Sequence, residues 1–360
     1  MRYKYGLFLG LSFSILSLGI ACSSDGNEYV PVPIQQSPVV VDLAQVPYAK
    51  LSDYKFFSGA MKNQKPAYGV LLYKPVSELF TDYALKKRFV WMPMGTKATY
   101  DGDAKVLNLP VGAALVKTFY YNNVQPSNTT RIIETRVMIR KATGWIFADY
   151  IWNDEQTEAI LQMDGSYTAV SWTVNGVIKS SNYRIPSELE CAACHKISNV
   201  VLPIGIKPQN LNYKYPDNVN QLSNWISKGY LENNLPANIV SVIDYNDTSK
   251  PLNLRVRSYF DANCGHCHQE GGYGDFYAMR FPFSETTTLA NMGVCVTPNH
   301  FVPGQTGEIV KPGDLNRSIL YYRMNTNDFS YRMPFLGRSI THEEGVGLVG
   351  DWILSLTDCE

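Results

Sequence analysis

Two pentapeptides hold the side chains of this sequence that are best suited to chemistry. They are Cys191-Ala-Ala-Cys194-His195 and Cys264-Gly-His-Cys267-His268, and both match the pattern C-x-x-C-H. Two thiols at this spacing can each add to one vinyl group of the same porphyrin, and the histidine that follows can donate a nitrogen to its iron. Such a pentapeptide is expected roughly 0.002 times by chance in a chain of this composition. The sequence therefore predicts two covalently bound haem c groups, with His195 and His268 as iron ligands.

The rival interpretation of the two motifs is a structural zinc site built from two C-x-x-C halves. It leaves the histidine after each cysteine pair without a role. An exported chain would also suit covalent haem attachment, which occurs outside the bacterial cytoplasm.

The N-terminus predicts export from the cytoplasm. Arg2 and Lys4 precede an apolar run from Gly6 to Ile20, which is too short to span a bilayer comfortably. Cys22 follows this run and matches the lipid-bearing cysteine of a bacterial lipoprotein, although an ordinary secretory signal with a spare cysteine is the alternative. We expect a signal peptide over 1–22, a flexible tether over 23–46, and a lipid anchor in the cell envelope, in the periplasm or at the surface.

Composition argues against nucleic acid as a partner and leaves two cysteines that could form a disulfide. Lys and Arg together number 32, as do Asp and Glu, so no strongly basic field predicts nucleic-acid binding. Cys295 and Cys359 are left over from the haem motifs and the lipid site, and they can pair as a disulfide in an oxidising compartment. The sequence alone leaves that pairing open.

Residues 47–184 have the pattern of a β domain. Four runs are rich in β-branched, aromatic and aliphatic residues, over 105–109, 115–121, 131–140 and 145–152. Asn175-Gly176 between apolar runs predicts a hairpin, because both central positions of a type I′ turn need positive φ. A β-sandwich or barrel is expected here.

The pattern becomes helical after residue 184. Ser187 to Glu190 has the form of a capping box, which predicts that the first haem motif opens on a short helix. Helices are also expected over 218–228, over 254–262, and after a second capping box at Thr341 to Glu344. The sequence thus predicts an α+β multidomain chain in which the β domain is followed by two α-helical cytochrome c-like regions, a first haem region over 185–252 and a second over 253–360.

The sixth iron ligand distinguishes the two haem regions. Met333, in Arg332-Met-Pro334 ahead of the last helix, is the predicted axial ligand of the second haem, with Met324 as runner-up. Core packing is the alternative role for either methionine. No Met or His lies between His195 and Cys264, so the first haem must take its sixth ligand from elsewhere, from Lys or Tyr, or from water. The Met and His residues open to that role are Met92, Met94, Met163, His300 and His342.

From about residue 47 to the C-terminus, the chain resembles a poorly characterised family of exported bacterial diheme c-type cytochromes with an N-terminal β domain. Besides the haem motifs, the matching pieces are Gly112, Lys117-Thr-Phe119, Glu134-Thr-Arg136, the segments 150–159 and 185–187, 204–212, 220–222, 255–259, Pro312-Gly313 and 332–337. The resemblance implies haem binding and electron transfer, and names no substrate.

Three functions are compatible with these features. The first is an electron carrier that exchanges electrons with redox proteins of the envelope, which is not an enzyme. The second is a diheme peroxidase-like oxidoreductase whose first haem is the reactive site. The third is a binding protein whose β domain takes a ligand and whose haems form a redox relay.

Overall fold

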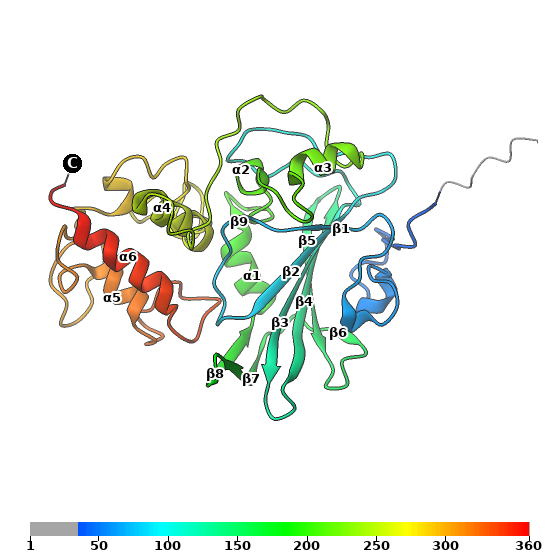
Figure 1. Ribbon diagram of the computed structural model, residues 1–360, viewed down its shortest axis with the longest axis horizontal. Helices are drawn as coiled ribbons and strands as arrows, with labels where there is room; N and C mark the ends of the chain where they lie inside the picture. The colour runs from blue at the N-terminus through cyan, green and yellow to red at the C-terminus, as the bar shows by residue number, and fades with distance from the viewer. Residues whose placement is uncertain (1–34, 360) are drawn as a thin grey trace, which may run out of the picture. The chain divides into compact units, whose positions relative to one another are not determined.

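The computed structural model describes residues 35–359, and its dominant element is a single antiparallel sheet of eight strands (Figure 1). The strands run in the order β1-β2-β3-β4-β5-β6, with β7 paired to β3 and to β8. Their bounds are β1 Leu71–Tyr73, β2 Leu85–Trp91, β3 Ala114–Val124, β4 Thr129–Lys141, β5 Gly144–Trp152, β6 Ala159–Leu161, β7 Ser166–Val174 and β8 Val177–Ile185. The signal segment and the lipid site at Cys22 lie outside the described residues.

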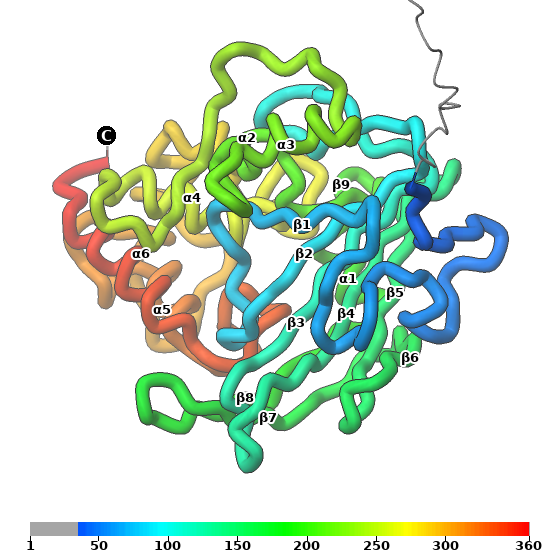
Figure 2. Tube along the Cα trace, turned by 45° about the vertical axis from the view of Figure 1, so that its right-hand side comes forward, coloured from blue at the N-terminus to red at the C-terminus, as the bar shows by residue number. Residues whose placement is uncertain are grey.

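The α-helices of the described residues are short. They are α1 Glu188–His195, α2 Pro208–Leu211, α3 Gln221–Ser227, α4 Leu252–Asn263, α5 Ile319–Asn325 and α6 Glu343–Ser355. Between α1 and α2 lies a small hairpin of β9 (Lys196–Ile197) and β10 (Val200–Val201). Figures 1 and 2 show α1 against the sheet, whereas α4, α5 and α6 gather together beside it. Within residues 35–359, no helix has the length and apolar character needed to cross a membrane.

The predicted fold class was wrong. The described chain is mostly antiparallel sheet with short helices, and it does not contain two α-helical cytochrome c-like regions. The β strands form one continuous sheet because β3 and β4, of 11 and 13 residues, are long enough to pair with neighbours along their whole length. The first C-x-x-C-H motif has no helical domain of its own, since α1 rests on the sheet.

Several local predictions are confirmed and two are wrong. The runs over 115–121, 131–140 and 145–152 lie inside β3, β4 and β5, and Asn175 and Gly176 have φ of 50° and 79° in the β7–β8 hairpin. The run over 105–109 is not a strand, and contributes only an isolated bridge between Asn108 and Thr99. The capping box at Ser187 is present, but α6 begins after His342 without a side-chain cap. Thr341 instead donates its hydroxyl hydrogen to Asn327.

The C-terminal helices form their own apolar core. Val346, Val349, Trp352 and Ile353 of α6 are buried in it, as the apolar stripe predicts. Cys295 and Cys359 are joined as a disulfide, with 5.7 Å between their Cα atoms, and this bond ties the end of the chain to the same unit.

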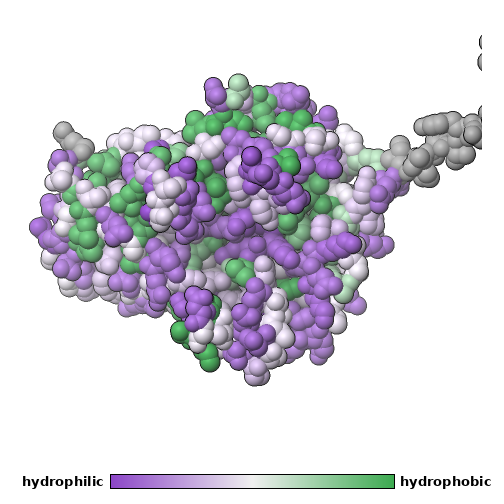
Figure 3. Space-filling view, viewed as in Figure 1, coloured by the Kyte–Doolittle hydropathy of each residue, from purple (hydrophilic) through white to green (hydrophobic). Residues whose placement is uncertain are grey.

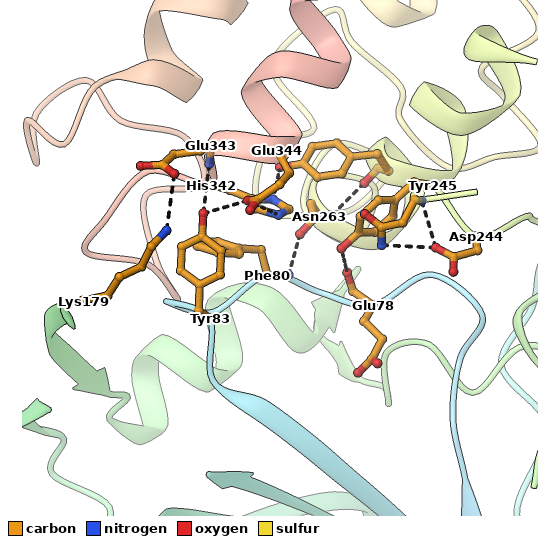
Figure 4. Close-up of polar contacts among 12 residues, drawn as sticks. Glu78, Phe80, Tyr83, Lys179, Asp244, Tyr245, Asn263, His342, Glu343 and Glu344 are labelled. Atoms are coloured by element: carbon orange, nitrogen blue, oxygen red, sulfur yellow. Dashed lines mark hydrogen bonds and ion pairs between the residues drawn. The ribbon is translucent and has the colours of Figure 1, made fainter. Parts of the chain in front are cut away.

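The segment before β2 joins the sheet to the C-terminal helices (Figure 4). The contacts in this segment are Phe80 N to Asn263 Oδ1 at 2.8 Å, the Tyr83 hydroxyl to Glu344 Oε2 at 2.7 Å, and the Tyr245 hydroxyl to the Glu78 carbonyl at 3.1 Å. Phe80 also stacks on His342, with ring centroids 4.1 Å apart. These contacts hold the C-terminal helices against the sheet.

Asp82 is the buried charge in this junction. Its carboxylate accepts hydrogen bonds from Ser181 Oγ at 2.6 Å, from Ser339 N at 2.7 Å, and from Ile340 N at 3.2 Å. One side chain thus connects β8 with the loop before α6. Figure 3 shows hydrophobic residues elsewhere on this face only as separate patches, one of them over the β7–β8 hairpin.

We expect Asp82→Asn to lower the free energy of unfolding by about 1–3 kcal/mol, because an amide offers one acceptor oxygen where the buried donors need two. Asn tolerates the left-handed backbone of this position, where φ is 47°, so the substitution tests the hydrogen bonds. Urea unfolding measures the change. Asp154→Asn, at an exposed ion pair with Arg131, is the control and should cost about 0.5 kcal/mol or less. Equal effects of the two substitutions would contradict this role of Asp82.

Candidate functional site

The first motif is held by a capped helix on the face of the sheet. Ser187 N donates to Glu190 Oε2 at 2.7 Å and Glu190 N donates to Ser187 Oγ, so both residues of the box satisfy free groups of the first turn. Arg184, at the end of β8, pairs with the same Glu190 carboxylate at 2.6 Å. The helix is therefore fixed at the strand from which it emerges, and it carries Cys191, Cys194 and His195 on its last two turns.

The ring of His195 is oriented by the loop that follows α1. Its Nδ1 lies 2.7 Å from the Leu202 carbonyl oxygen, and Leu202 N donates back to the His195 carbonyl at 2.8 Å. A hydrogen bond at Nδ1 fixes the tautomer that presents a free Nε2, as in histidines that ligate a metal. Burial lowers the pKa of His195 to about 4, so the imidazole is neutral at pH 7 and can donate a lone pair.

The second motif follows directly from the end of α4. Cys264 is the residue after the helix, and the next turn brings Cys267 and His268 round to the same side. His268 Nδ1 is buried and has no hydrogen-bond partner among the described residues, and burial lowers the pKa of this imidazole also to about 4. The ring is packed edge-on against Phe281, with centroids 5.5 Å apart.

Each motif opens onto a cavity. The cavity at the first motif has a volume of about 830 Å³ and lies between α1 and the sheet, with Cys191, Cys194 and His195 in its lining. The cavity at the second motif has a volume of about 310 Å³ and is lined by Cys264, Cys267 and His268. Both volumes are in the range of cofactor sites. A thiol pair, a neutral buried imidazole and an adjoining cavity are what covalent attachment of a haem requires, so both sites fit that group.

The two motifs meet, although Cys194 and Cys267 are 73 positions apart in the sequence. The ligand atoms of Cys194, His266 and Cys267 all lie within 4.8 Å of one another. Cys194 and His266 line both cavities, together with Pro334 and Leu336. His266 therefore lies in the wall between the two cavities, a place that its position inside the second motif did not indicate.

This contact also bears on the zinc interpretation. Within the described residues, the group contains only one cysteine of each motif, and Cys191 and Cys264 lie outside it. A closed site of four cysteines is therefore not formed here.

The two methionines considered as ligands of the second haem are part of the second cavity. Met333 and Met324 both line it, and so does His300. Met333 is held by two backbone hydrogen bonds, from its own N to the Arg323 carbonyl at 2.8 Å and from Arg338 Nε to its carbonyl at 3.1 Å. Met324 is buried in the helical core. The structure keeps Met333 as the predicted ligand and Met324 and His300 as alternatives.

None of the Met and His residues considered for the first haem lines the first cavity. Met92 is buried in the core, Met94 is 67% exposed, and the Met163 sulfur accepts a hydrogen bond from Asp149 N. His300 lines the second cavity, and His342 is hydrogen-bonded to Tyr259 at 3.1 Å. Other side chains with suitable atoms line the first cavity, among them His266 of the second motif and, from the sheet, Tyr73, Lys117 and Met138. Sequence spacing could not find the residues of the sheet, because pairing of the strands brings them to the cavity.

The cavity's sheet wall has one further property, a row of charged residues. Arg88, Lys117 and Arg136 lie directly opposite one another on β2, β3 and β4, and all three line the cavity. Burial, together with the charges of Arg88 and Arg136, lowers the pKa of Lys117 well below its usual value. Burial and the neighbouring Glu134 raise the pKa of Asp149, on β5, well above that of a free carboxyl group.

Comparison with known proteins adds no relative to this description. No protein-family model, curated protein or solved structure matches the chain.

We expect Gly274→Ala to disturb the second motif. A methyl group at Gly274 would lie 2.9 Å from His268 Nδ1 and 3.3 Å from the Cys267 carbonyl oxygen, so the imidazole would have to move. Crowding of this kind costs about 1–3 kcal/mol, which thermal or urea unfolding measures. Gly347→Ala is the matched control, because nothing lies within 4 Å of a methyl group there and helix α6 should gain about 0.5–1 kcal/mol. A stabilised Gly274→Ala variant would show that the motif has room at this point.

Proposed function

We propose that the chain is a diheme c-type cytochrome, with one haem on Cys191, Cys194 and His195 and the other on Cys264, Cys267 and His268. The observation that carries the proposal is the contact between the two motifs at Cys194 and Cys267. The bound haem irons would supply one-electron redox chemistry. The chain's own residues attach each macrocycle through two thioether bonds, offer a neutral imidazole to each iron, and exclude water from the wall that the cavities share.

Electron transfer between the two sites follows from the same contact. If Cys194 and Cys267 each carry a macrocycle, each macrocycle is joined through a single thioether bond to a cysteine at the shared wall. The edges of the two groups are then neighbours, and an electron can pass directly between them. The chain would accept electrons from one redox protein and deliver them to another.

The place of this function is the bacterial cell envelope. The proposal is supported by the apolar leader, by Cys22 as a lipid-bearing residue, and by the disulfide between Cys295 and Cys359, which is typical of exported proteins. The chain would be held at the membrane by its lipid and would meet its redox partner proteins there.

A peroxidase-like activity is the second candidate, favoured by the first cavity. It is more than twice as large as the second, and its lining includes Lys117, Arg136 and Asp149, which could hold or transfer protons beside a small oxidant. Peroxide reduction consumes two electrons and two protons and yields two waters, so the second site would have to supply electrons. Turnover of hydrogen peroxide with a reduced redox protein as donor would favour this candidate.

The haem content of the purified chain tests the main proposal. We expect two haems per chain in the alkaline pyridine assay when the protein is made with the export and haem-attachment machinery. Cys264→Ala with Cys267→Ala should leave one haem, and Cys191→Ala with Cys194→Ala should leave the other. Cys295→Ser with Cys359→Ser is the control and should leave both. A protein with zinc and no haem would contradict the proposal.

Met333→Ala tests the axial ligand of the second haem. We expect the ferric protein to lose the near-infrared charge-transfer band of methionine ligation, and the midpoint potential of one haem to fall, because a thioether favours the ferrous state. Met324→Ala is the control and should keep the band while lowering stability by about 2–5 kcal/mol, since its side chain is in the core. The opposite result would assign the ligand to Met324, a band that survives both substitutions would point to another methionine, and a wild-type protein without the band would point to His300.

A further inference from the structure

The row of residues across the sheet wall of the first cavity is unusual in its charge. Tyr73, Arg88, Lys117, Arg136 and Asp149 lie directly opposite one another on β1 to β5, and all five line the cavity. Like charges directly opposite on neighbouring strands are destabilising. Burial and the charges of Arg88 and Arg136 disfavour the protonated form of Lys117, so the three basic side chains can all be charged only when a negative charge joins them.

The acidic residues beside this row do not compensate it fully. Glu78 pairs with Arg88 at 2.7 Å and with Lys74 at 2.9 Å, and Glu134 pairs with Arg136 and accepts from the Tyr183 hydroxyl. Within residues 35–359, Lys117 has no ion pair and no hydrogen bond. Lys117 Nζ lies over the Phe119 ring, 4.7 Å from its centroid. Arg136 Nε is likewise buried without a hydrogen-bond partner.

Asp149, at the end of the row, does not supply the missing charge. Arg136 Nε lies 3.8 Å from Asp149 Oδ2, beyond hydrogen-bond distance, and burial together with Glu134 raises the pKa of Asp149, which favours its neutral form. The cavity wall thus holds the amine of Lys117 without an ionic partner and the Nε of Arg136 without a hydrogen-bond partner among the described residues.

An apolar row runs beside the charged one. Leu115, Met138 and Phe147 lie opposite one another on β3, β4 and β5, two residues along from Lys117, Arg136 and Asp149. Phe147 is packed edge-on against His195, with ring centroids 5.3 Å apart. The wall is therefore apolar next to the histidine of the first motif and cationic further away.

We propose that Lys117 and Arg136 form a binding site for a carboxylate or small oxyanion in the first cavity. The anion would accept hydrogen bonds from Lys117 Nζ and from Arg136 and would neutralise the row. Two sources have this chemistry. One is a propionate of the first haem, whose apolar macrocycle would then cover Leu115, Met138 and Phe147, and the other is an anion from solution. The haem source rests on the proposed function, whereas the site itself does not.

The test compares the holoprotein with two variants of matched charge. Lys117→Gln removes the ammonium from the cavity. Lys87→Gln removes one from the other face of the same sheet, where Lys87 lies 5.9 Å from the Tyr120 ring, and serves as the control. Lys117→Arg keeps the positive charge and should restore the wild-type behaviour. The measurements are haem content, the midpoint potential of each haem, and a titration with sodium formate against sodium chloride at equal ionic strength, followed by the Soret spectrum and thermal unfolding.

Each source predicts its own result. If a propionate is bound, Lys117→Gln shifts the one-electron equilibrium of one haem about tenfold toward the ferric state, which is about 59 mV, and formate has no effect. If a dissolved anion is bound, formate raises the unfolding temperature of the wild type saturably, and binding to Lys117→Gln is at least tenfold weaker. Should the glutamine variant fail to fold, Lys117→Met, with a side chain of similar length, replaces it.

Two results would overturn the site or separate it from the proposed function. If the Lys117→Gln and Lys87→Gln variants have the same midpoint potentials and the same response to formate, the row binds no anion. A wild-type chain without haem contradicts the proposed function alone, because the formate titration of that chain still tests the anion site.

Discussion

The close approach of Cys194 to Cys267 is the constraint on which the arrangement of this molecule depends. It brings the end of α1, which rests on the sheet, to the turn after α4, which belongs to the C-terminal helices. For the two cysteines to meet, the helices must be held against the sheet. The buried carboxylate of Asp82 and the contacts of Phe80, Tyr83 and Tyr245 hold them there. The junction between the two parts of the fold is thus also the place where the two sites share a wall.

The two sites differ in what surrounds an identical motif. The second lies within helices and loops, where Phe281, Met324 and Met333 enclose a small and largely apolar space. The first lies under a sheet whose strand pairing sets an apolar row beside a cationic one. A sheet presents residues from several strands to one cavity, and their identities are independent of the motif. The first site therefore has more room and more charged residues in its wall than the second.

Local features could be predicted from the sequence because their causes are local. The capping box at Ser187, the Asn175-Gly176 turn and the apolar stripe of α6 each depend on residues within a few positions of one another. The assignment of Met333 to the second cavity also needed only its nearness to the last helix. The helical cytochrome c-like regions were wrong because C-x-x-C-H specifies the turn that carries the motif, and not the elements packed against it.

Features that arise from strand pairing were not accessible in the same way. Arg88, Lys117 and Arg136 are spread over 49 positions and become neighbours only through the register of β2, β3 and β4. Lys117 and Arg136 are both in segments that carry the family resemblance, yet nothing in their spacing indicates one cavity. The approach of Cys194 to Cys267 is of the same kind, since it depends on packing between distant elements.

The disulfide between Cys295 and Cys359 has a consequence for the order in which the chain matures. Its formation needs an oxidant, whereas the proposed attachment of haem would need the thiols of both C-x-x-C-H motifs to stay reduced until they react with a porphyrin. In the folded chain Cys194 and Cys267 are near enough for the same oxidant to join them, which would block both motifs at once. If the proposed haems are attached, attachment to at least one motif has to come before the sheet and the C-terminal helices close on each other, or a reductant has to protect the thiols meanwhile.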